Sequence, residues 1–261
     1  MKSKIIIVFI NLLIIHSISI AQKTRYLPFG LGASYQSVQD LGMSPLIYRG
    51  AAFNLTFGYI EEKENYIDRN QFLLHVGGMI NKHQESFSTT LLRGDYSYLH
   101  VRKVTSFYND NMNYFLGGQL AFAANSRING RLTNIGFGYD FLQSIGVSNW
   151  ARYKFQLFER DFTLDANINI PVLTFIMRPN YTSIGDFTNP EANEAKALLD
   201  RGKLVSLGKF VRISNLFHLS YYLKNGNAFM LSYNWDFYSY NQVNRVKAAY
   251  HAVYFTTLFN L

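Results

Sequence analysis

The sequence predicts an all-β protein, a transmembrane antiparallel up-and-down β-barrel of about 12 strands, with ten as the fallback count. The first observation behind this prediction is strict alternation in residues 228–240. Its odd positions hold Phe229, Leu231, Tyr233, Trp235 and Phe237, and its even positions hold Met230, Ser232, Asn234, Asp236 and Tyr238. Because successive side chains of a strand point to opposite faces, one face is apolar and aromatic while the other is mostly polar. That arrangement suits a strand with lipid on one side and a polar barrel interior on the other.

Composition gives the second observation. Aromatic residues make up 16% of the chain, and charged residues also make up only 16%. Soluble domains typically carry about 25% charged residues. A surface with so few charges would be adhesive in water but not in a bilayer. After the N-terminal segment no apolar stretch reaches the roughly 20 residues of a spanning helix, so we expect the chain to cross the membrane as strands.

The first 21 residues are expected to be a signal peptide, followed by one barrel domain over residues 22–261. Lys2 and Lys4 form a positive region, residues 5–15 are apolar, and Ser19 and Ala21 supply small residues before a cut at about Gln22. A single N-terminal membrane anchor is the alternative interpretation. The chain has no cysteine, which excludes disulfides, thiolate metal sites and thiol nucleophiles.

Segments in which apolar and polar residues alternate, separated by connections that contain Gly and Asn, predict the strands in order. Most are 9–14 residues long, which suits tilted membrane strands that need about 9–11 residues. The expected strands cover residues 29–38, 52–60, 71–81, 95–104, 114–125, 135–142, 147–158, 162–174, 210–223, 228–240 and 248–261.

This set has an odd number of strands, whereas a closed bacterial barrel with both termini in the periplasm needs an even number. Twelve strands result if one more strand lies in residues 42–50 or 86–94, and ten result if an early assignment is wrong. Asn225-Gly226 predicts a tight hairpin turn. If Leu261 ends in the periplasm, that turn is periplasmic, and residues 241–247 and 178–209 form outer loops.

A short helix is expected in the second of these outer loops, over residues 189–202. Asn189 can cap it, Pro190 suits its first position, Glu191 and Glu194 favour its positive end, and Gly202 can terminate it. The helix would act as a lid, or would pack on the barrel rim.

The polar and charged positions of the strands are expected to face the barrel interior. An Arg or Lys side chain that faces hydrocarbon near mid-bilayer costs about 2–4 kcal/mol. The inward-facing side chains would line a narrow aqueous passage tuned toward anions, or would pair across the lumen and fill it. Tyr and Trp residues near strand ends, Tyr59, Trp150, Trp235 and Tyr250, are expected at the membrane interfaces. The candidate lumen-lining residues are Arg152, Lys154, Asp165, Asn167, Asn169, Arg212, His218, Asn234 and Asp236.

The ending Ala21-Gln22 of the signal sequence, the aromatic-rich alternating strands and the last eight residues, YFTTLFNL, together resemble Gram-negative outer-membrane β-barrel proteins. The resemblance is a pattern over the whole mature chain. It implies location in the outer membrane, contact with outer-membrane lipid, and recognition of the C-terminal strand by the barrel-assembly machinery. Such proteins usually end in an aromatic residue, whereas Leu261 ends this chain, with Phe259 and Phe255 on the same face.

Several function classes find little support. The formal charge is +8, or +6 without Lys2 and Lys4, but the basic residues are scattered and no nucleic-acid-binding module is present. His218 and Ser220, two residues apart, raise the question of a lipid hydrolase, but both should face the lumen rather than lipid. No metal-binding spacing is present, and no catalytic, cofactor-binding or metal residue is assigned.

The sequence leaves the function open between two main hypotheses, a narrow pore for small polar or anionic solutes and a closed structural barrel. An accessory barrel that docks a larger envelope complex is the alternative, and a lipid-modifying enzyme is less favoured.

Overall fold

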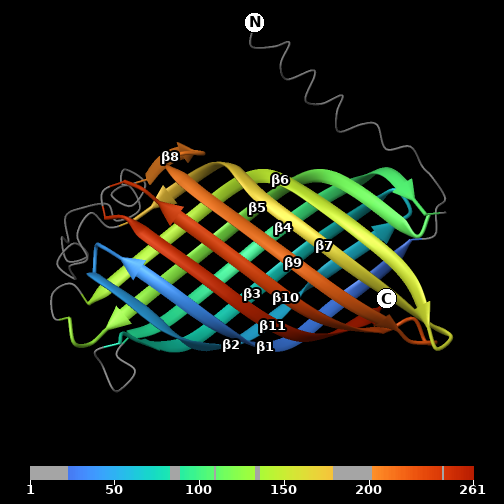
Figure 1. Cartoon of the computed structure of the whole chain (residues 1–261), viewed down its shortest axis with the longest axis horizontal. Coiled ribbons are helices and arrows are strands. Elements are labelled where there is room, and N and C mark those ends of the chain that lie inside the picture. Colours follow the sequence, from blue (N-terminus) through green and yellow to red (C-terminus); the bar gives the residue numbers. More distant parts are fainter. Residues whose placement is uncertain (1–22, 83–88, 109, 133–135, 179–201, 243) are drawn as a thin grey trace, which may run out of the picture.

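The computed structural model describes residues 23–82, 89–108, 110–132, 136–178, 202–242 and 244–261. Ten antiparallel strands close into a barrel, and a short eleventh strand lies at one end (Figure 1). Among the described residues there is no helix, and so none that could cross a membrane. The strands are β1 (Thr24–Asp40), β2 (Ser44–Lys63), β3 (Tyr66–Ile80), β4 (Thr89–Phe107), β5 (Met112–Asn129), β6 (Phe137–Leu157), β7 (Arg160–Met177), β8 (Gly202–Ser206), β9 (Phe210–Tyr222), β10 (Ala228–Tyr240) and β11 (Val246–Asn260).

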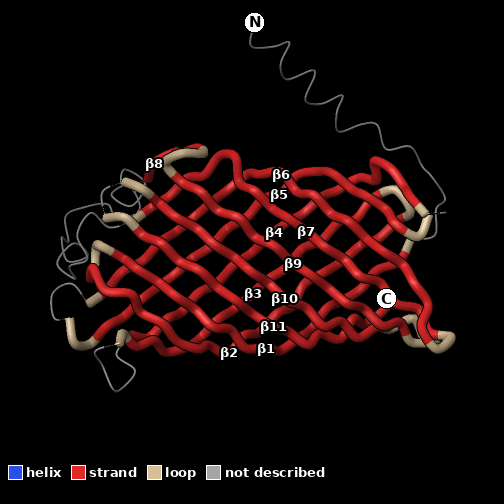
Figure 2. The backbone as a smooth tube through the Cα atoms, viewed as in Figure 1, coloured by secondary structure: helices blue, strands red, loops and turns tan. Residues whose placement is uncertain are grey.

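The barrel closes through two pairings. β1 pairs with β11 from Tyr26↔Asn260 to Asp40↔Val246, so the first and last strands are neighbours. β6 pairs with β7 along most of its length, and β7 then pairs with β9. The continuous mesh of strands in Figure 2 follows from these pairings. A closed ring leaves no long unpaired edge, which is the condition for β-structure in lipid.

The two ends of the barrel differ. At the end that carries the start of β1 and the end of β11, called the terminal end here, hairpins after β2, β4, β6 and β9 are short. The Asn225-Gly226 turn lies there, with Gly226 at a φ of 85°. The opposite end, called the loop end, carries the connections after β3, β5, β7 and β10. The 225–226 turn and the 241–245 connection therefore lie at opposite ends, as the parity of the strands requires.

The preferred count of twelve strands is wrong, and the fallback of ten barrel strands is confirmed. Residues 135–142 and 147–158, expected as two strands, belong to the single strand β6. The stretches 42–50 and 86–94 hide no further strand in their described residues, because they contain the beginnings of β2 and β4. Joining two expected strands into one restores the even number.

An irregularity in β7 lies opposite the point where β6 was expected to break. The register shifts between Ile145 and Gly146, which pair with Leu173 and Pro171, so Val172 is left over. Val172 and Leu173 both face outward, and the inward positions change from odd to even beyond them. Pro171 has no N–H to donate, and prolines within sheets occur at such bulges. Because of the bulge, β6 stays continuous, and the inward-facing positions of β7 change from odd to even numbers.

Two other expectations fall mainly on residues outside the described ranges. The helix over 189–202 lies there except for Gly202, which begins strand β8 and is not helical. β8 pairs with the end of β7, from Leu173↔Ser206 to Met177↔Gly202. The signal peptide over residues 1–21 also lies outside the described residues and stays a prediction.

Candidate functional site in the barrel interior

The barrel carries its apolar residues outside and its charged residues inside. On β1 the outward residues Leu27, Phe29 and Leu31 are 43–51% exposed, and on β10 Leu231 is 51% exposed. Neighbouring outward rings stack, for example Phe57 on Phe72 with ring centroids 5.0 Å apart. A continuous apolar belt of this kind around a closed barrel requires lipid as its surroundings.

The structure places the candidate lumen-lining residues on the inner face. Arg152, Asp165, Asn167, Asn169, Arg212, His218, Asn234 and Asp236 are all buried in the barrel interior. Lys154 has the same parity as Arg152 but is exposed, because it lies at the open terminal end. Two residues expected at the membrane interface are instead interior: Trp150 and Tyr250 are both buried, since their even positions in β6 and β11 face inward.

At the loop end the interior holds four charged side chains and one tyrosine, named the loop-end cluster: Asp40, Arg127, Asp140, Arg178 and Tyr238. Nη2 of Arg127 lies 2.8 Å from Oδ2 of Asp40 and 2.7 Å from Oδ2 of Asp140. Arg178 binds the same two carboxylates, with Nη2 2.7 Å from Asp40 Oδ1 and Nη1 at Asp140 Oδ1. The Tyr238 hydroxyl donates to Asp140 at 2.7 Å. Two arginines thus hold two carboxylates from β1 and β6.

Half-way along the barrel lies a second group, the middle cluster of Arg93, Asp95, Arg212 and Asp236. Arg93 pairs with Asp95 at 2.5 Å through Nε, and its Nη2 pairs with Asp236 on β10. Arg212 pairs with Asp236 at 2.9 Å and with Asp95 at 3.2 Å. The guanidinium carbon of Arg93 also lies 3.9 Å from the ring centroid of Tyr250, a cation–π contact.

Near the terminal end a third group, the terminal-end cluster, consists of Glu62, Arg152 and Asp165. Arg152 donates to both oxygens of Glu62 at 2.7 and 2.8 Å, and Nε donates to Asp165 at 2.6 Å. Trp150 donates to the same Asp165 oxygen at 2.9 Å. Between this cluster and the middle one, Arg69 Nη1 lies 2.6 Å from His218 Nε2, and His218 Nδ1 lies 2.7 Å from the Ser232 hydroxyl.

These contacts join opposite walls of the barrel. β4 and β10 are five strand steps apart in either direction around the ten-strand ring, and Arg93–Asp236 joins them. The same separation holds for β3 and β9, joined by Arg69–His218. It also holds for β1 and β6, whose aspartates share Arg127. The lumen is therefore crossed at three levels.

The interior charges balance. The three clusters together with Arg69 contain six arginines and six carboxylates: Arg69, Arg93, Arg127, Arg152, Arg178 and Arg212 against Asp40, Glu62, Asp95, Asp140, Asp165 and Asp236. An anion-selective constriction would carry an excess of positive charge. A balanced set of close pairs instead leaves none of these buried charges without an opposite charge beside it.

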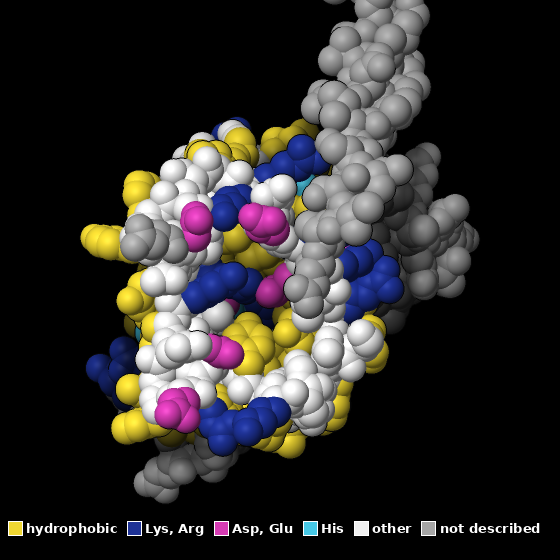
Figure 3. All heavy atoms as spheres, turned by 90° about the vertical axis from the view of Figure 1, so that its right-hand side faces the viewer, with side chains coloured by type: hydrophobic (Ala, Val, Ile, Leu, Met, Phe, Trp, Pro, Cys, Tyr) yellow, Lys and Arg dark blue, Asp and Glu magenta, His cyan; other side chains and the backbone are white. Residues whose placement is uncertain are grey.

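The free space lies at the terminal end rather than through the barrel. A cavity of about 670 Å³, lined by Lys154, Thr163 and Tyr222, reaches inward to Arg152 and Glu62. A second cavity of about 400 Å³ adjoins Lys103 and Asp110. The space beside the middle cluster measures only about 40 Å³. Figure 3 looks onto the terminal end, where acidic and basic side chains surround this hollow.

The interior position of His218 and Ser220 leaves a lipid substrate no access to them. His218 bonds Ser232 on the neighbouring strand rather than Ser220, which is also buried. The other ring nitrogen of His218 is taken up by Arg69. A lipid hydrolase needs its nucleophile where lipid can reach it, whereas these side chains are enclosed by the barrel wall.

Sequence reasoning missed most of the cross-lumen partners. Arg93 and Arg127 lie just beyond the expected strand limits of 95 and 125, although both continue the inward parity of their strands. Asp140 alternates with outward Tyr139 and Phe141 inside an expected strand, so its inward direction was already visible. Extending the two strands until their alternation fails would have added Arg93 and Arg127 to the inward set.

The closed ring, the outward apolar belt and the buried charges decide the class of protein. The chain forms a closed ten-strand β-barrel with the apolar exterior of a membrane-spanning barrel.

Comparison with solved structures finds matches of low similarity. The translocator domain of the autotransporter NalP from Neisseria meningitidis matches at 6% identity, with 99% of this chain and 95% of that chain covered and a TM-score of 0.36. The β domain of the Bordetella autotransporter BrkA matches at 10% identity, with 88% and 98% covered and a TM-score of 0.37. The COG4313 outer-membrane channel from Pseudomonas putida F1 matches at 8% identity, with 93% and 97% covered and a TM-score of 0.32. No protein-family model and no curated protein matches the chain. We take no function from these similarities.

Proposed function

We propose that this protein is a closed outer-membrane barrel that works as a structural or docking element of the cell envelope. Its lumen would not conduct solutes in the state described here, and partners would meet its loops or rims. The observation that carries this proposal is the Arg93–Asp236 pair, which joins opposite strands β4 and β10 at mid-barrel.

The energetics of the interior support a closed state. Removing one partner of a buried ion pair typically costs about 3–5 kcal/mol, because the remaining charge is left without compensation. A passage would require the middle cluster, the loop-end cluster and the Arg69–His218 contact to separate together. Since the clusters are held by different strands, no single loop movement would release all of them.

A narrow pore is the second candidate, and the cavity at the terminal end favours it. Lys154 and Lys103 at that mouth would attract anions. The cavity stops at Arg152 and Glu62, whose side chains bond each other across the lumen. A pore would therefore need a signal that opens the terminal-end cluster first.

Planar-bilayer recording separates the two candidates. We expect no conductance steps from the purified wild-type barrel. The double variant Arg93→Ala/Asp236→Ala removes the central pair without changing the net charge. We expect it to stay silent as well, because the loop-end cluster and the Arg69–His218 contact still cross the lumen. Regular steps from the wild type would overturn the proposal.

The matched control is Leu92→Ala/Phe237→Ala. These residues lie on the same two strands but on the lipid face. We expect this variant to remain silent, which would assign any conductance of the first variant to the interior and not to a weakened wall. Heat-modifiable migration on gels checks that all three proteins form barrels.

A further inference from the structure

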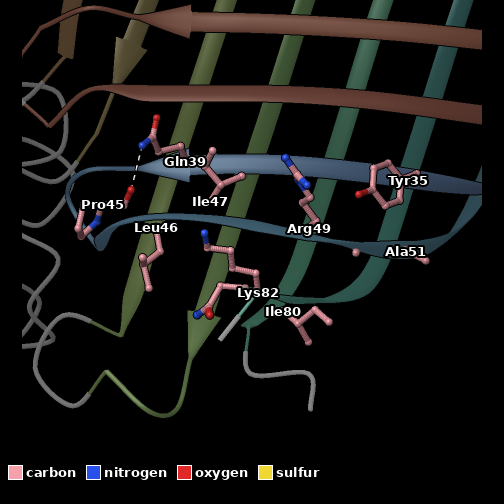
Figure 4. A pocket seen from close by; sticks show the side chains of 11 residues that line it. Tyr35, Gln39, Pro45, Leu46, Ile47, Arg49, Ala51, Ile80 and Lys82 are labelled. Carbon is pink, nitrogen blue, oxygen red and sulfur yellow. Dashed lines mark hydrogen bonds between the residues drawn. The ribbon is translucent and has the colours of Figure 1, made fainter. Parts of the chain in front are cut away.

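The outer wall of the barrel carries a groove near the loop end. It has a volume of about 730 Å³ and extends over the outward faces of β1, β2 and β3. Figure 4 shows Tyr35 and Ala51 at one end of this groove and Pro45 and Leu46 at the other, with Arg49, Lys82 and Ile80 between them. We call these residues and the surface between them the outer groove.

The groove exists because small residues interrupt the wall. Tyr35, Ala51 and Gly78 are paired in register across β1, β2 and β3, so an outward row offers one large side chain beside two small ones. The neighbouring row on the terminal-end side holds Phe53 and Val76, which restore the full thickness of the wall. The result is a trough with a mostly apolar lining.

The groove carries two cations near the loop end. On β2 the outward residues Phe57, Leu55, Phe53 and Ala51 are followed by Arg49 and then by the exposed Ile47. On β3 the outward apolar series ends at Ile80 and is followed by Lys82. Both cations are exposed and, among the described residues, neither has an ion-pair partner, in contrast to the arginines of the interior.

We propose that the outer groove binds one anionic phospholipid-like molecule of the surrounding membrane leaflet, with its phosphate between Arg49 and Lys82 and an acyl chain along Ala51 and Ile80. An apolar trough alone would accept any chain, but two exposed cations beside it, without an ion-pair partner among the described residues, select a negative headgroup. Arg provides a fork of donors for phosphate oxygens, and Lys provides a point charge. This inference concerns the outer wall and does not depend on whether the lumen is closed.

Native mass spectrometry of the detergent-solubilised barrel tests the inference by counting bound lipids. We expect one phosphatidylglycerol to be retained preferentially over phosphatidylcholine. Arg49→Gln/Lys82→Gln should lose this preference, by roughly fivefold for each cation removed. Ala51→Leu, which fills the trough without changing charge, should weaken retention of both lipids. Inorganic phosphate should not compete, because it lacks the chain.

The control is Arg160→Gln/Lys224→Gln, which removes two exposed cations at the terminal end, far from the groove. We expect it to bind phosphatidylglycerol as the wild type does. Equal loss in both double variants would mean unspecific attraction by net charge and would overturn the proposal. So would unchanged binding in Arg49→Gln/Lys82→Gln, or equal retention of the two lipids by the wild type.

Discussion

At the scale of single residues, the outward or inward direction of a side chain decides which substitutions the barrel tolerates. Leu231 faces lipid on β10, between Phe229 and Tyr233. An arginine there would cost about 2–4 kcal/mol near the bilayer midplane. We therefore expect Leu231→Arg to prevent most of the protein from forming a heat-modifiable barrel on gels.

The matched substitution is Gln156→Arg, which adds the same charge at the terminal end. Gln156 is exposed and its amide donates to Asp161 at 2.9 Å, so an arginine can bond the same carboxylate. We expect normal assembly from this variant. Equal assembly of the two variants would refute the assignment of faces.

At the scale of strands, alternation predicted the facing of residues but not the continuity of β6. All eleven expected strands fall on parts of the ten barrel strands, and the division of β6 near Gly146 was wrong. The sequence around Gly146 contains small residues typical of a turn, and only the register with Pro171 shows that the irregularity belongs to β7. A single sequence carries no information on that pairing.

Close approach of strands gives a second test at this scale. A Cβ added at Gly117 on β5 would lie 1.9 Å from the carbonyl oxygen of His100 on β4, whereas a Cβ at Gly94 on β4 would meet nothing within 4 Å. We expect Gly117→Ala to destabilise the barrel by about 1–3 kcal/mol, as overpacking does, and Gly94→Ala to change stability little. Urea unfolding followed by tryptophan fluorescence measures both, and similar losses in the two variants would contradict the register of β4 with β5.

At the scale of the whole molecule, the candidate site depends on which walls face each other across the lumen. The inward parity of Arg212 and Asp236 is legible in the sequence, and so is that of Asp165. The partners of these residues are not, because parity gives the face of a strand but neither its tilt nor its position around the ring. The contact of Arg93 with Asp236 needs both.

The cross-lumen contact makes a quantitative prediction for the stability of the closed ring. In a double-mutant cycle of Arg93→Ala and Asp236→Ala, each single variant leaves a buried charge without one partner, so the double variant should lose less stability than the sum of the two. We expect a coupling energy of about 1–3 kcal/mol from urea unfolding in detergent. The same cycle on Lys23 and Glu61, which pair at 2.7 Å on the partly exposed terminal rim, should give about 0.2–1 kcal/mol. If the two cycles gave equal coupling, the interior pair would be no more than a surface contact, and the opposite walls of the barrel would not be joined at mid-height.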